Sequence, residues 1–397
     1  MKLIKLVFVS SIMWFGLTTL NAQEITPVVT TLAGSGSAGS ANGTGAAASF
    51  SSPRGVAVDG SGNLYVADMN NQKIRKITSA GVVTTLAGSG ASGSTDGTGT
   101  AALFYKPEGV AVDGSGNVYV GDSSNNLIRK ITSAGVVTTL AGSGSAGSTD
   151  GTGTAASFNY PYGVAVDGSG NVYVADRNNH LIRKITSAGV VTTLAGSGSA
   201  GSADGTGTAA SFNGPTGVAV DGSGNVYVAD QSNHLIRKIT SAGVVTTLAG
   251  SGSQGSANGT GTAASFYYPK GVAVDGSGNV YVGDEDNHLI RKITSAGVVT
   301  TLAGSGSQGS ANGTGTRASF DNPMGVAVDG SGNVYVADKN NDLIRKIFFS
   351  IATATTLNVP SHYSTIQAAI DAATAGDTVL VADGTYTENL DIDKDIK

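Results

Sequence analysis

Three histidines stand at the same place in successive copies of a repeated text, and such a set could ligate a metal. They are His180, His234 and His288, spaced by 54 residues. Imidazole nitrogens bind zinc at about 2 Å. In a closed ring of six such units, however, equivalent points on neighbouring units lie one radius apart, roughly 10–12 Å when strands are spaced about 4.8 Å outward from a channel. We therefore predict structural histidines, with no metal and no other cofactor.

Two sets of aspartates could bind cations or take part in acid–base chemistry. Each aspartate lies at the end of a predicted strand, where its carboxylate can accept backbone N–H groups across a turn. Both sets occur in all six units, as a structural role requires, whereas an active site needs one or two units to differ. We predict structural roles, with one arginine per unit as the candidate partner of the second set. The first set is Asp59, Asp113, Asp167, Asp221, Asp275 and Asp329; the second is Asp68, Asp122, Asp176, Asp230, Asp284 and Asp338; the arginines are Arg75, Arg129, Arg183, Arg237, Arg291 and Arg345.

Two further polar patterns argue against ligand sites. GSGSAG from Gly34 to Gly39 fits a dinucleotide-binding pattern, but a further strand follows it instead of the helix that would bind the pyrophosphate. One position alternates between Asp and Asn, and the loss of half the charges disfavours calcium and favours an Asx turn. Its members are Asn42, Asp96, Asp150, Asp204, Asn258 and Asn312.

The elements that position these residues come from one repeat. Six prolines spaced by 54 residues open near-identical units, of which residues 161–195 are typical: PYGVAVDGSGNVYVADRNNHLIRKITSAGVVTTLA. Each unit predicts four strands: a (GVAVD), b (NVYVAD), c (HLIRKI) and d (VVTTLAG), with turns at DGSGN and TSAG. One such unit cannot bury both faces, so the copies must pack radially as a six-bladed β-propeller of four-stranded blades, an all-β fold.

The two ends of the array predict how the ring closes. Strand d occurs first at residues 28–34, before any strand a, whereas the last unit ends at Ile347 with Phe348 and Phe349 following and no strand d. We therefore expect the N-terminal strand to complete the last blade.

The blades differ at two positions, which are the candidate ligand-binding residues. Because strands alternate in direction, the b–c and d–a connections share one face, and both positions lie there; the opposite face carries the invariant DGSGN and TSAG turns. Selected binding diversity and free drift of unconstrained loops explain this equally well. The candidates are Arg54, Glu108, Tyr162, Thr216, Lys270 and Met324 after the prolines, and Met69, Arg177, Gln231, Glu285 and Lys339 after the second aspartates. Arg54 and Glu108 could pair with each other at an exposed rim.

Composition restricts the class of partner. The chain of 397 residues has 59 Gly, 13% charged residues, no cysteine and a net charge of −5. No basic stripe supports a nucleic-acid partner. Residues 1–22 are typical of a secretory signal peptide, with Lys2 and Lys5 before an apolar stretch and Ala22 at the cleavage point. We expect a secreted monomer at the cell surface, in the periplasm or outside the cell, with no membrane span after cleavage.

The unit text P-x-G-V-A-V-D-G-S-G-N-V-Y-V-A-D-x-x-N-H-L-I-R-K-I resembles the NHL repeat, from Pro27 to about Phe349. The resemblance implies a propeller, residues 23–349, that recognises proteins, nucleic acids or glycans in different settings. It also implies that a few relatives are enzymes with metals or nucleophiles on the central channel. The inner strand GVAVD is identical in all six blades, which offers no such site.

Residues 350–397 contain a second pattern. Ser364 and Gln367 form a capping-box signal; Ile366, Ala369, Ile370 and Ala373 make an apolar stripe; Gly376 ends the predicted helix; and residues 378–381 form a short strand. The text from Leu357 resembles the cap and first coil of a right-handed parallel β-helix of the pectin-lyase-like fold. Because the sequence stops at Lys397, we expect an incomplete β-helix, and no catalytic residue of that family carries over.

These observations favour an exported binding or scaffold protein over an enzyme. The expected partner is a protein or glycan, bound on the b–c and d–a face. Two alternatives stay open: a carbohydrate-active enzyme, built on the β-helix or on a lyase-like channel site, and a structural spacer at the cell surface.

Overall fold

A computed structural model describes residues 5–8, 25–351, 356–361, 363–372 and 378–382. They form two compact units: residues 28–348, and a small unit drawn from residues 1–27 and 349–397. No helix among the described residues is long and apolar enough to cross a membrane.

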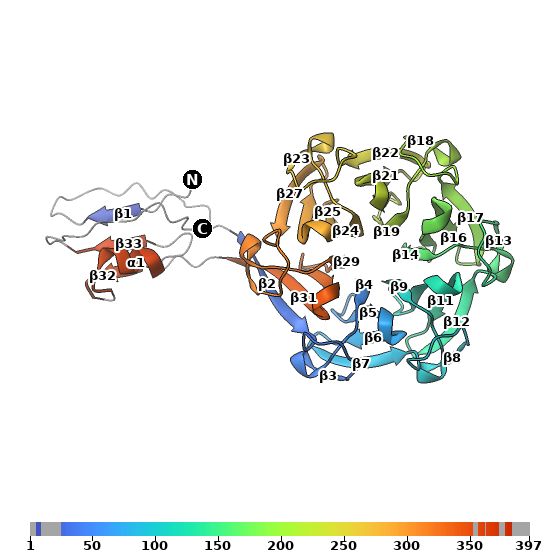
Figure 1. The fold of residues 1–397 in the computed structure, drawn as a ribbon, viewed down its shortest axis with the longest axis horizontal. Coiled ribbons are helices and arrows are strands. Elements are labelled where there is room, and N and C mark those ends of the chain that lie inside the picture. The colour runs from blue at the N-terminus through green and yellow to red at the C-terminus, as the bar shows by residue number, and fades with distance from the viewer. Residues whose placement is uncertain (1–4, 9–24, 352–355, 362, 373–377, 383–397) are drawn as a thin grey trace. The chain divides into compact units, whose positions relative to one another are not determined.

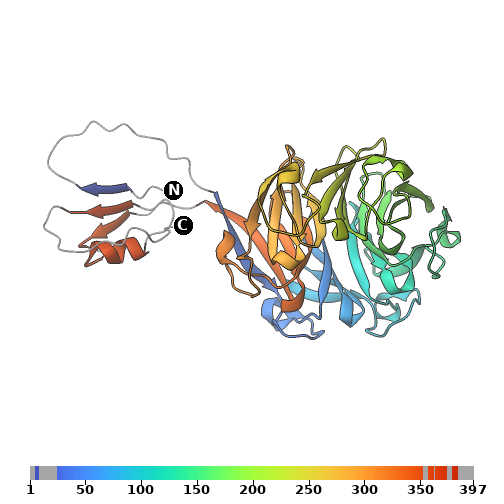
Figure 2. The ribbon, with the colours of Figure 1, turned by 45° about the horizontal axis from the view of Figure 1, so that its top comes forward.

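Six antiparallel sheets are arranged as a ring in the larger unit (Figures 1 and 2). Their innermost strands line a central channel. Each sheet is one blade, and its strands run outward from the channel in a fixed order. The innermost strands are β4 (Pro53–Val58), β9 (Pro107–Val112), β14 (Pro161–Val166), β19 (Pro215–Val220), β24 (Pro269–Val274) and β29 (Pro323–Val328). The second strands are β5 (Leu64–Asp68), β10 (Val118–Asp122), β15 (Val172–Asp176), β20 (Val226–Asp230), β25 (Val280–Asp284) and β30 (Val334–Asp338).

The outer strands complete the blades. The third strands are β6 (Lys73–Ile77), β11 (Leu127–Ile131), β16 (Leu181–Ile185), β21 (Leu235–Ile239), β26 (Leu289–Ile293) and β31 (Leu343–Ile351). The fourth strands are β7 (Val82–Ala87), β12 (Val136–Ala141), β17 (Val190–Ala195), β22 (Val244–Ala249), β27 (Val298–Ala303) and β2 (Ile25–Ala33). The fifth strands are β3 (Gly43–Thr44), β8 (Gly97–Thr98), β13 (Gly151–Thr152), β18 (Gly205–Thr206), β23 (Gly259–Thr260) and β28 (Gly313–Thr314).

The prediction of four strands per blade is therefore wrong. The d–a connection first runs along the outer edge of the next blade, where Gly43 and Thr44 pair with Val83 and Val82 of β7. A single turn of 3₁₀-helix then leads the chain inward. Two residues are too few to show the alternation of apolar and polar side chains that identifies a strand. The 3₁₀ turns that follow the two-residue strands are Gly45–Ala47, Gly99–Ala101, Gly153–Ala155, Gly207–Ala209, Gly261–Ala263 and Gly315–Arg317.

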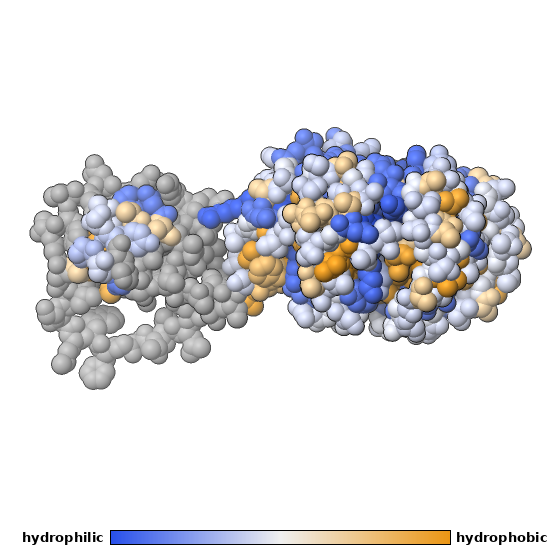
Figure 3. Space-filling model, turned by 90° about the horizontal axis from the view of Figure 1, so that it is seen from below, coloured by the Kyte–Doolittle hydropathy of each residue, from blue (hydrophilic) through white to orange (hydrophobic). Residues whose placement is uncertain are grey.

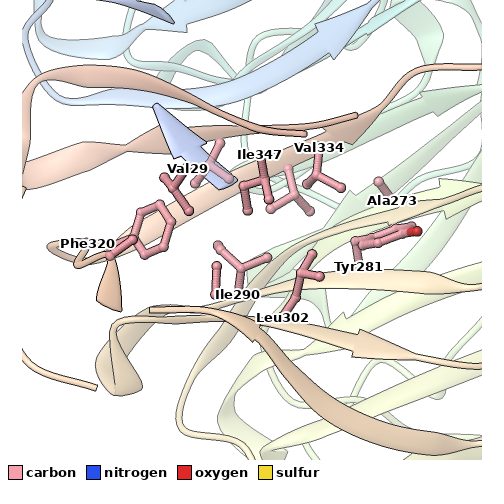
Figure 4. Close-up of a cluster of buried hydrophobic side chains, with 12 residues drawn as sticks. Val29, Ala273, Tyr281, Ile290, Leu302, Phe320, Val334 and Ile347 are labelled. Atoms are coloured by element: carbon pink, nitrogen blue, oxygen red, sulfur yellow. The ribbon is translucent and has the colours of Figure 1, made fainter. Parts of the chain in front are cut away.

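The closure of the ring is confirmed. β2, from the N-terminal end of the sequence, lies between β28 and β31 in the last blade (Figure 1). Its Val29 is fully buried with Ile290, Phe320 and Ile347 between the fifth and sixth blades (Figure 4). Its Ala33 is buried between the sixth blade and the first. One strand thus contributes to the hydrophobic cores on both sides of the last blade.

The hydrophobic core is divided into six clusters, one between each pair of neighbouring blades. Because a blade is covered on both faces, strands such as β15 (VYVAD) are buried at every residue and do not alternate. At the channel the inner strands approach very closely: a Cβ on Gly55 would lie 2.5 Å from the carbonyl oxygen of Glu108 in the next blade. Glycine at this position allows six inner strands to meet around a narrow channel.

The rim of the propeller carries its exposed hydrophobic residues singly. One valine at the start of the outer strand is about 38% exposed in each of five blades, for example Val136 and Val244. Seen from the edge in Figure 3, the propeller surface has separate hydrophobic patches among residues of intermediate hydropathy. Hydrophobic residues that are exposed singly in this way are ordinary on protein surfaces.

The small unit is a parallel sheet with one helix. Its strand order is β1 (Lys5–Phe8), β33 (Thr378–Val381), β32 (Thr356–Val359), and α1 (Ile366–Ala372) packs on the sheet. The predicted strand and apolar stripe are confirmed where described, with Ile366, Ala369 and Ile370 buried. Thr365, not Ser364, caps the helix by accepting the N–H of Ala368 at 3.1 Å. Ala373 and Gly376 lie outside the described residues.

A β-helix is not seen in the described part of this unit. β33 lies between β32 and β1. β1 belongs to the predicted signal peptide, and its residues Lys5 to Phe8 pair in parallel with β33. The rest of residues 1–22 lies outside the described ranges, and the signal peptide stays a prediction.

Candidate functional site

The six variable residues after the prolines form a ring at one mouth of the channel. Each is the second residue of an innermost strand, because those strands begin at the proline and not at the following glycine as expected. Five of them, all but Thr216, line a cavity of about 60 Å³ together with the Gly-Val pairs that follow all six. The ring, called here the mouth ring, consists of the six equivalent residues Arg54, Glu108, Tyr162, Thr216, Lys270 and Met324.

The expectation that these residues are exposed loop positions is wrong. The side chain of Arg54 is 18% exposed, that of Glu108 only 2%, and Lys270 is 9% exposed. Thr216 is fully buried and donates to the carbonyl oxygen of Lys270 at 3.1 Å. Burying unlike charged and polar groups disfavours folding unless they are paired.

The paired side chains cross the channel. Arg54 Nη1 lies 3.3 Å from Glu108 Oε2 and donates to Tyr162 Oη at 3.0 Å. Lys270 Nζ stands 5.7 Å from the centroid of the Tyr162 ring. Tyr160 Oη donates to Glu108 Oε1 at 3.4 Å. Arg54 and Glu108 do pair across neighbouring blades, but inside the mouth and not at an exposed rim.

The second variable set surrounds the mouth ring. Each residue begins a 3₁₀ turn between the second and third strands. Glu285 forms ion pairs with both Lys270, at 3.4 Å, and Lys339, at 3.5 Å. These contacts, with the bond from Asn71 Nδ2 to the carbonyl oxygen of Gly39, confirm that the b–c and d–a connections share a face. The turns are Met69–Asn71, Ser123–Asn125, Arg177–Asn179, Gln231–Asn233, Glu285–Asn287 and Lys339–Asn341. Met69, Gln231 and Glu285 are buried, and Arg177 and Lys339 are partly exposed.

Burial moves the two central ionisable groups toward their neutral forms. Burial raises the pKa of Glu108, against the opposing effects of Arg54 and Lys270. Burial likewise lowers the pKa of Lys270; Glu285 opposes this shift, while the positive charges of Arg177 and Arg54 add to it. A carboxyl group with a raised pKa and an amine with a lowered pKa thus border one cavity. Such a cavity is a candidate site for ligand binding or proton transfer.

Aromatic residues beside the mouth escaped the sequence analysis. The two residues before each proline also vary among the blades and include Tyr105, Tyr160, Tyr267 and Tyr268. The rings of Tyr267 and Tyr268 stack with centroids 5.1 Å apart, and His234 lies 4.9 Å from Tyr268. A comparison of the blades at these positions would have found them.

The two aspartate sets have the structural roles predicted for them. In the third blade, Asp167 accepts two backbone N–H groups, the Asn171 amide and the Tyr173 hydroxyl, which closes the DGSGN turn. Asp176 is fully buried and pairs with the fully buried Arg183 at 2.8 Å. The same pairing recurs in every blade.

The alternating Asp/Asn position does not form an Asx turn. Asp150 Oδ1 instead accepts from Arg183 Nη2 at 2.7 Å, and Asn42 Oδ1 accepts from Arg75 Nη2 at 2.9 Å. Both residue types offer this oxygen, which explains why either is found. The arginine thereby ties the d–a connection to the second strand.

The histidines join neighbouring blades through hydrogen bonds. Nδ1 of His180, His234 and His288 accepts a backbone N–H just before the next blade's proline, at 3.0, 3.2 and 3.1 Å. Asn126 Oδ1 accepts the equivalent bond from Tyr160 at 2.9 Å. Among the described residues, no group of three or more His, Asp or Glu could hold a metal ion. The absence of a bound metal remains a prediction.

These histidine bonds predict a pH dependence of stability. Burial, reinforced at His180 by Arg177, lowers the pKa of His180, and burial lowers that of His234. A folded pKa below the unfolded value of about 6.5 means that the contribution is complete above that pH and is lost as pH falls through the folded pKa. Asn at both positions keeps the acceptor without the titration. The double variant H180N/H234N should therefore lose less thermal stability than the natural chain between about pH 7.5 and about pH 5. Parallel losses in the two proteins would contradict the histidine assignment.

Two protein-family descriptions match the repeated units of this chain. The NHL repeat matches at residues 104–131, 158–185, 212–239 and 320–347, and the Teneurin NHL domain matches at 31–99 and 252–321. Protein SUPPRESSOR OF QUENCHING 1, chloroplastic, of Arabidopsis thaliana is 31% identical over 74% of this chain and 30% of its own length. NHL repeat-containing protein 2 of Bos taurus is 28% identical over 77% of this chain and 48% of its own length. The chain thus spans 30% to 48% of the length of these relatives.

Solved structures share the fold. A protein of unknown function from Bacteroides thetaiotaomicron superposes with a TM-score of 0.65 at 23% identity, and an auxiliary nutrient binding protein from the same species with 0.63 at 18%; each match covers 82% of this chain and 77% of the other. A gluconolactonase from Xanthomonas campestris superposes with 0.54 at 12%, over 81% of this chain and 89% of its own. The chain carries NHL repeats and folds as a six-bladed β-propeller.

Proposed function

We propose that this chain is a binding protein that takes a glycan or protein ligand at the mouth ring of its propeller. The observation that carries the proposal is the break in sixfold identity: six different residues stand in one ring, while the Gly-Val pairs that follow them in the cavity wall are the same in every blade. Drift on a free loop would not explain this, because the six positions are largely buried and include one acid, Glu108, and two bases, Arg54 and Lys270, whose charges must be paired.

Two other observations support a binding role. The cavity combines charged, hydroxyl and apolar side chains in one small space, as ligand sites do. One protein of the same fold carries the name auxiliary nutrient binding protein. We extend the proposal to an exported protein whose residues 1–22 are removed and whose residues 350–397 begin a β-helix. The mass of the N-terminal peptide of exported protein distinguishes cleavage after Ala22 from retention of β1.

The proposal predicts that ligand affinity depends on the mouth ring. Lys270→Met and Tyr162→Phe keep the side-chain volume, and methionine already occupies the equivalent position at Met324. A glycan and protein array should select a ligand for the natural propeller, with and without calcium. We expect each variant to bind that ligand at least tenfold more weakly, about 1.4 kcal/mol, with little change in melting temperature.

Lys184→Met is the matched control, because it removes the same charge from the third strand of a blade, where Lys184 stacks on Tyr173. It should leave affinity unchanged. Equal binding by all four proteins would contradict the proposal.

An enzyme is the second candidate, favoured by the opposite pKa shifts of Glu108 and Lys270 in one cavity. It predicts that the selected ligand is chemically altered on incubation and that Glu108→Gln stops the reaction while binding persists. Recovery of unaltered ligand supports the binding role.

A further inference from the structure

The mouth of the channel holds more positive than negative charge. The mouth ring and the second variable set together contain four cations, Arg54, Arg177, Lys270 and Lys339, but two carboxylates, Glu108 and Glu285. Asp286 adds one negative charge nearby and is hydrogen-bonded by Asn322 at 3.1 Å. These seven side chains therefore carry an excess of one positive charge, in a chain whose net charge is −5. A positively charged channel mouth raises the local concentration of anions.

The pairing leaves room for one more anion. Arg54 forms an ion pair with Glu108 at 3.3 Å, one cation with one carboxylate. Lys270 and Lys339, in contrast, both pair with the single carboxylate of Glu285. Lys270 is nine-tenths buried and lines the cavity with Arg54. An amine in that position gains from a second negative partner, because a buried charge that is only partly compensated is unfavourable.

The cavity is large enough for a compact group and too small for a whole ligand. Its volume of about 60 Å³ would hold a few water molecules. A carboxylate or phosphate group fits such a space, and the remainder of the ligand must stay outside on the b–c and d–a face.

Tyrosines occupy that face next to the mouth. Tyr160 reaches Glu108 with its hydroxyl, Tyr267 and Tyr268 stack on each other just before Pro269, and Tyr105 is 40% exposed. Tyrosine offers a flat apolar surface and a hydroxyl that still reaches solvent or a partner. A sugar ring, with one C–H face and several hydroxyls, suits such surroundings.

We propose that the mouth ring recognises an acidic sugar, whose anionic group enters the cavity between Arg54 and Lys270 while its ring lies outside against the tyrosines. This rests on the proposed function and narrows its ligand class. The carboxylate of a uronic acid and the phosphate of a sugar phosphate share the required chemistry.

Calorimetric titration of the whole chain with four probes tests the proposal: glucuronate, glucose 6-phosphate, glucose and adenosine monophosphate. We expect one or both acidic sugars to bind at least tenfold more tightly than glucose, and the two acidic probes tell carboxylate from phosphate. Binding should weaken as salt is raised. Equal affinity for glucose, or tighter binding of adenosine monophosphate than of either acidic sugar, overturns the proposal.

Two variants make the test specific. Lys270→Met should reduce the preference for the acidic sugar over glucose to less than about threefold, whereas the control Lys184→Met should retain it. Glu285→Gln should tighten binding of the acidic sugar severalfold, because it removes the carboxylate that occupies both lysines. Unchanged or weaker binding by Glu285→Gln contradicts the proposed charge balance. A neutral glycan that depends on Lys270 and Tyr162 would overturn the acidic-sugar inference and leave the proposed function standing.

Discussion

Replacing Arg183 by methionine is expected to lower the free energy of unfolding by about 3–5 kcal/mol, because it leaves a buried carboxylate without its charged partner. Arg183 is fully buried and donates to Asp176 at 2.8 Å and to Asp150 at 2.7 Å. It also donates to the carbonyl oxygens of Ser157 and Thr149, and its guanidinium carbon lies 5.2 Å from the centroid of the Phe158 ring. One side chain thus holds three segments of the blade together. Urea unfolding followed by circular dichroism measures the effect.

The adjacent lysine provides the control. Lys184→Met removes a charge one residue away, from a half-buried position, and should change stability by less than about 1 kcal/mol. Adding Asp176→Asn to Arg183→Met should recover part of the loss, since the unpaired charge is then gone. A loss below about 1 kcal/mol for Arg183→Met would show that the repeated Asp–Arg pair is dispensable.

Removal of residues 23–35 should have the second large effect, a loss of about 5 kcal/mol or more. The deletion takes away β2, with Val29 and Ala33 from two hydrophobic clusters and the hydrogen bonds to β28 and β31. It also opens the edge of β31, and an open edge promotes association between chains. Denaturant unfolding and light scattering report the two consequences.

A peptide of residues 23–35 added back to the deleted chain should restore stability as its concentration rises, because it refills a preformed edge. A chain that lacks only residues 1–22 retains β2 and serves as the control. Unchanged stability and a monomeric state in the chain that lacks residues 23–35 would contradict closure by β2.

Most of the fold could be predicted because the same strand pattern occurs in six near-identical units. The 54-residue period gave the number of blades, and the displaced copy of strand d at residues 28–34 gave the closure. The fifth strand could not be predicted: Gly43-Thr44 and its equivalents have no side-chain pattern, and their pairing depends on where the preceding loop reaches the blade's edge. The short parallel sheet in the small unit depends on β1, which local sequence signals did not connect to β33.

The candidate site was located by variation among the blades, but its environment was predicted wrongly. Starting strand a at Gly163 placed Tyr162 in a loop, whereas the strand begins at Pro161. The register between this strand and β15 shifts between Pro161 and Val164, so the alternation of side chains along the strand could not be extended to residue 162. Glu108 and Lys270 are buried because the six inner strands approach one another closely. The distance between inner strands of different blades cannot be predicted from the sequence of one blade.

The most direct test of the central claim is a crystal structure of the propeller with the ligand that the array selects. We expect ligand density in the cavity at the mouth ring, within hydrogen-bonding distance of Lys270 and in contact with Tyr162. Density on the opposite face, over the DGSGN turns, or along the outer rim would contradict it, and the variation at the mouth ring would then be drift.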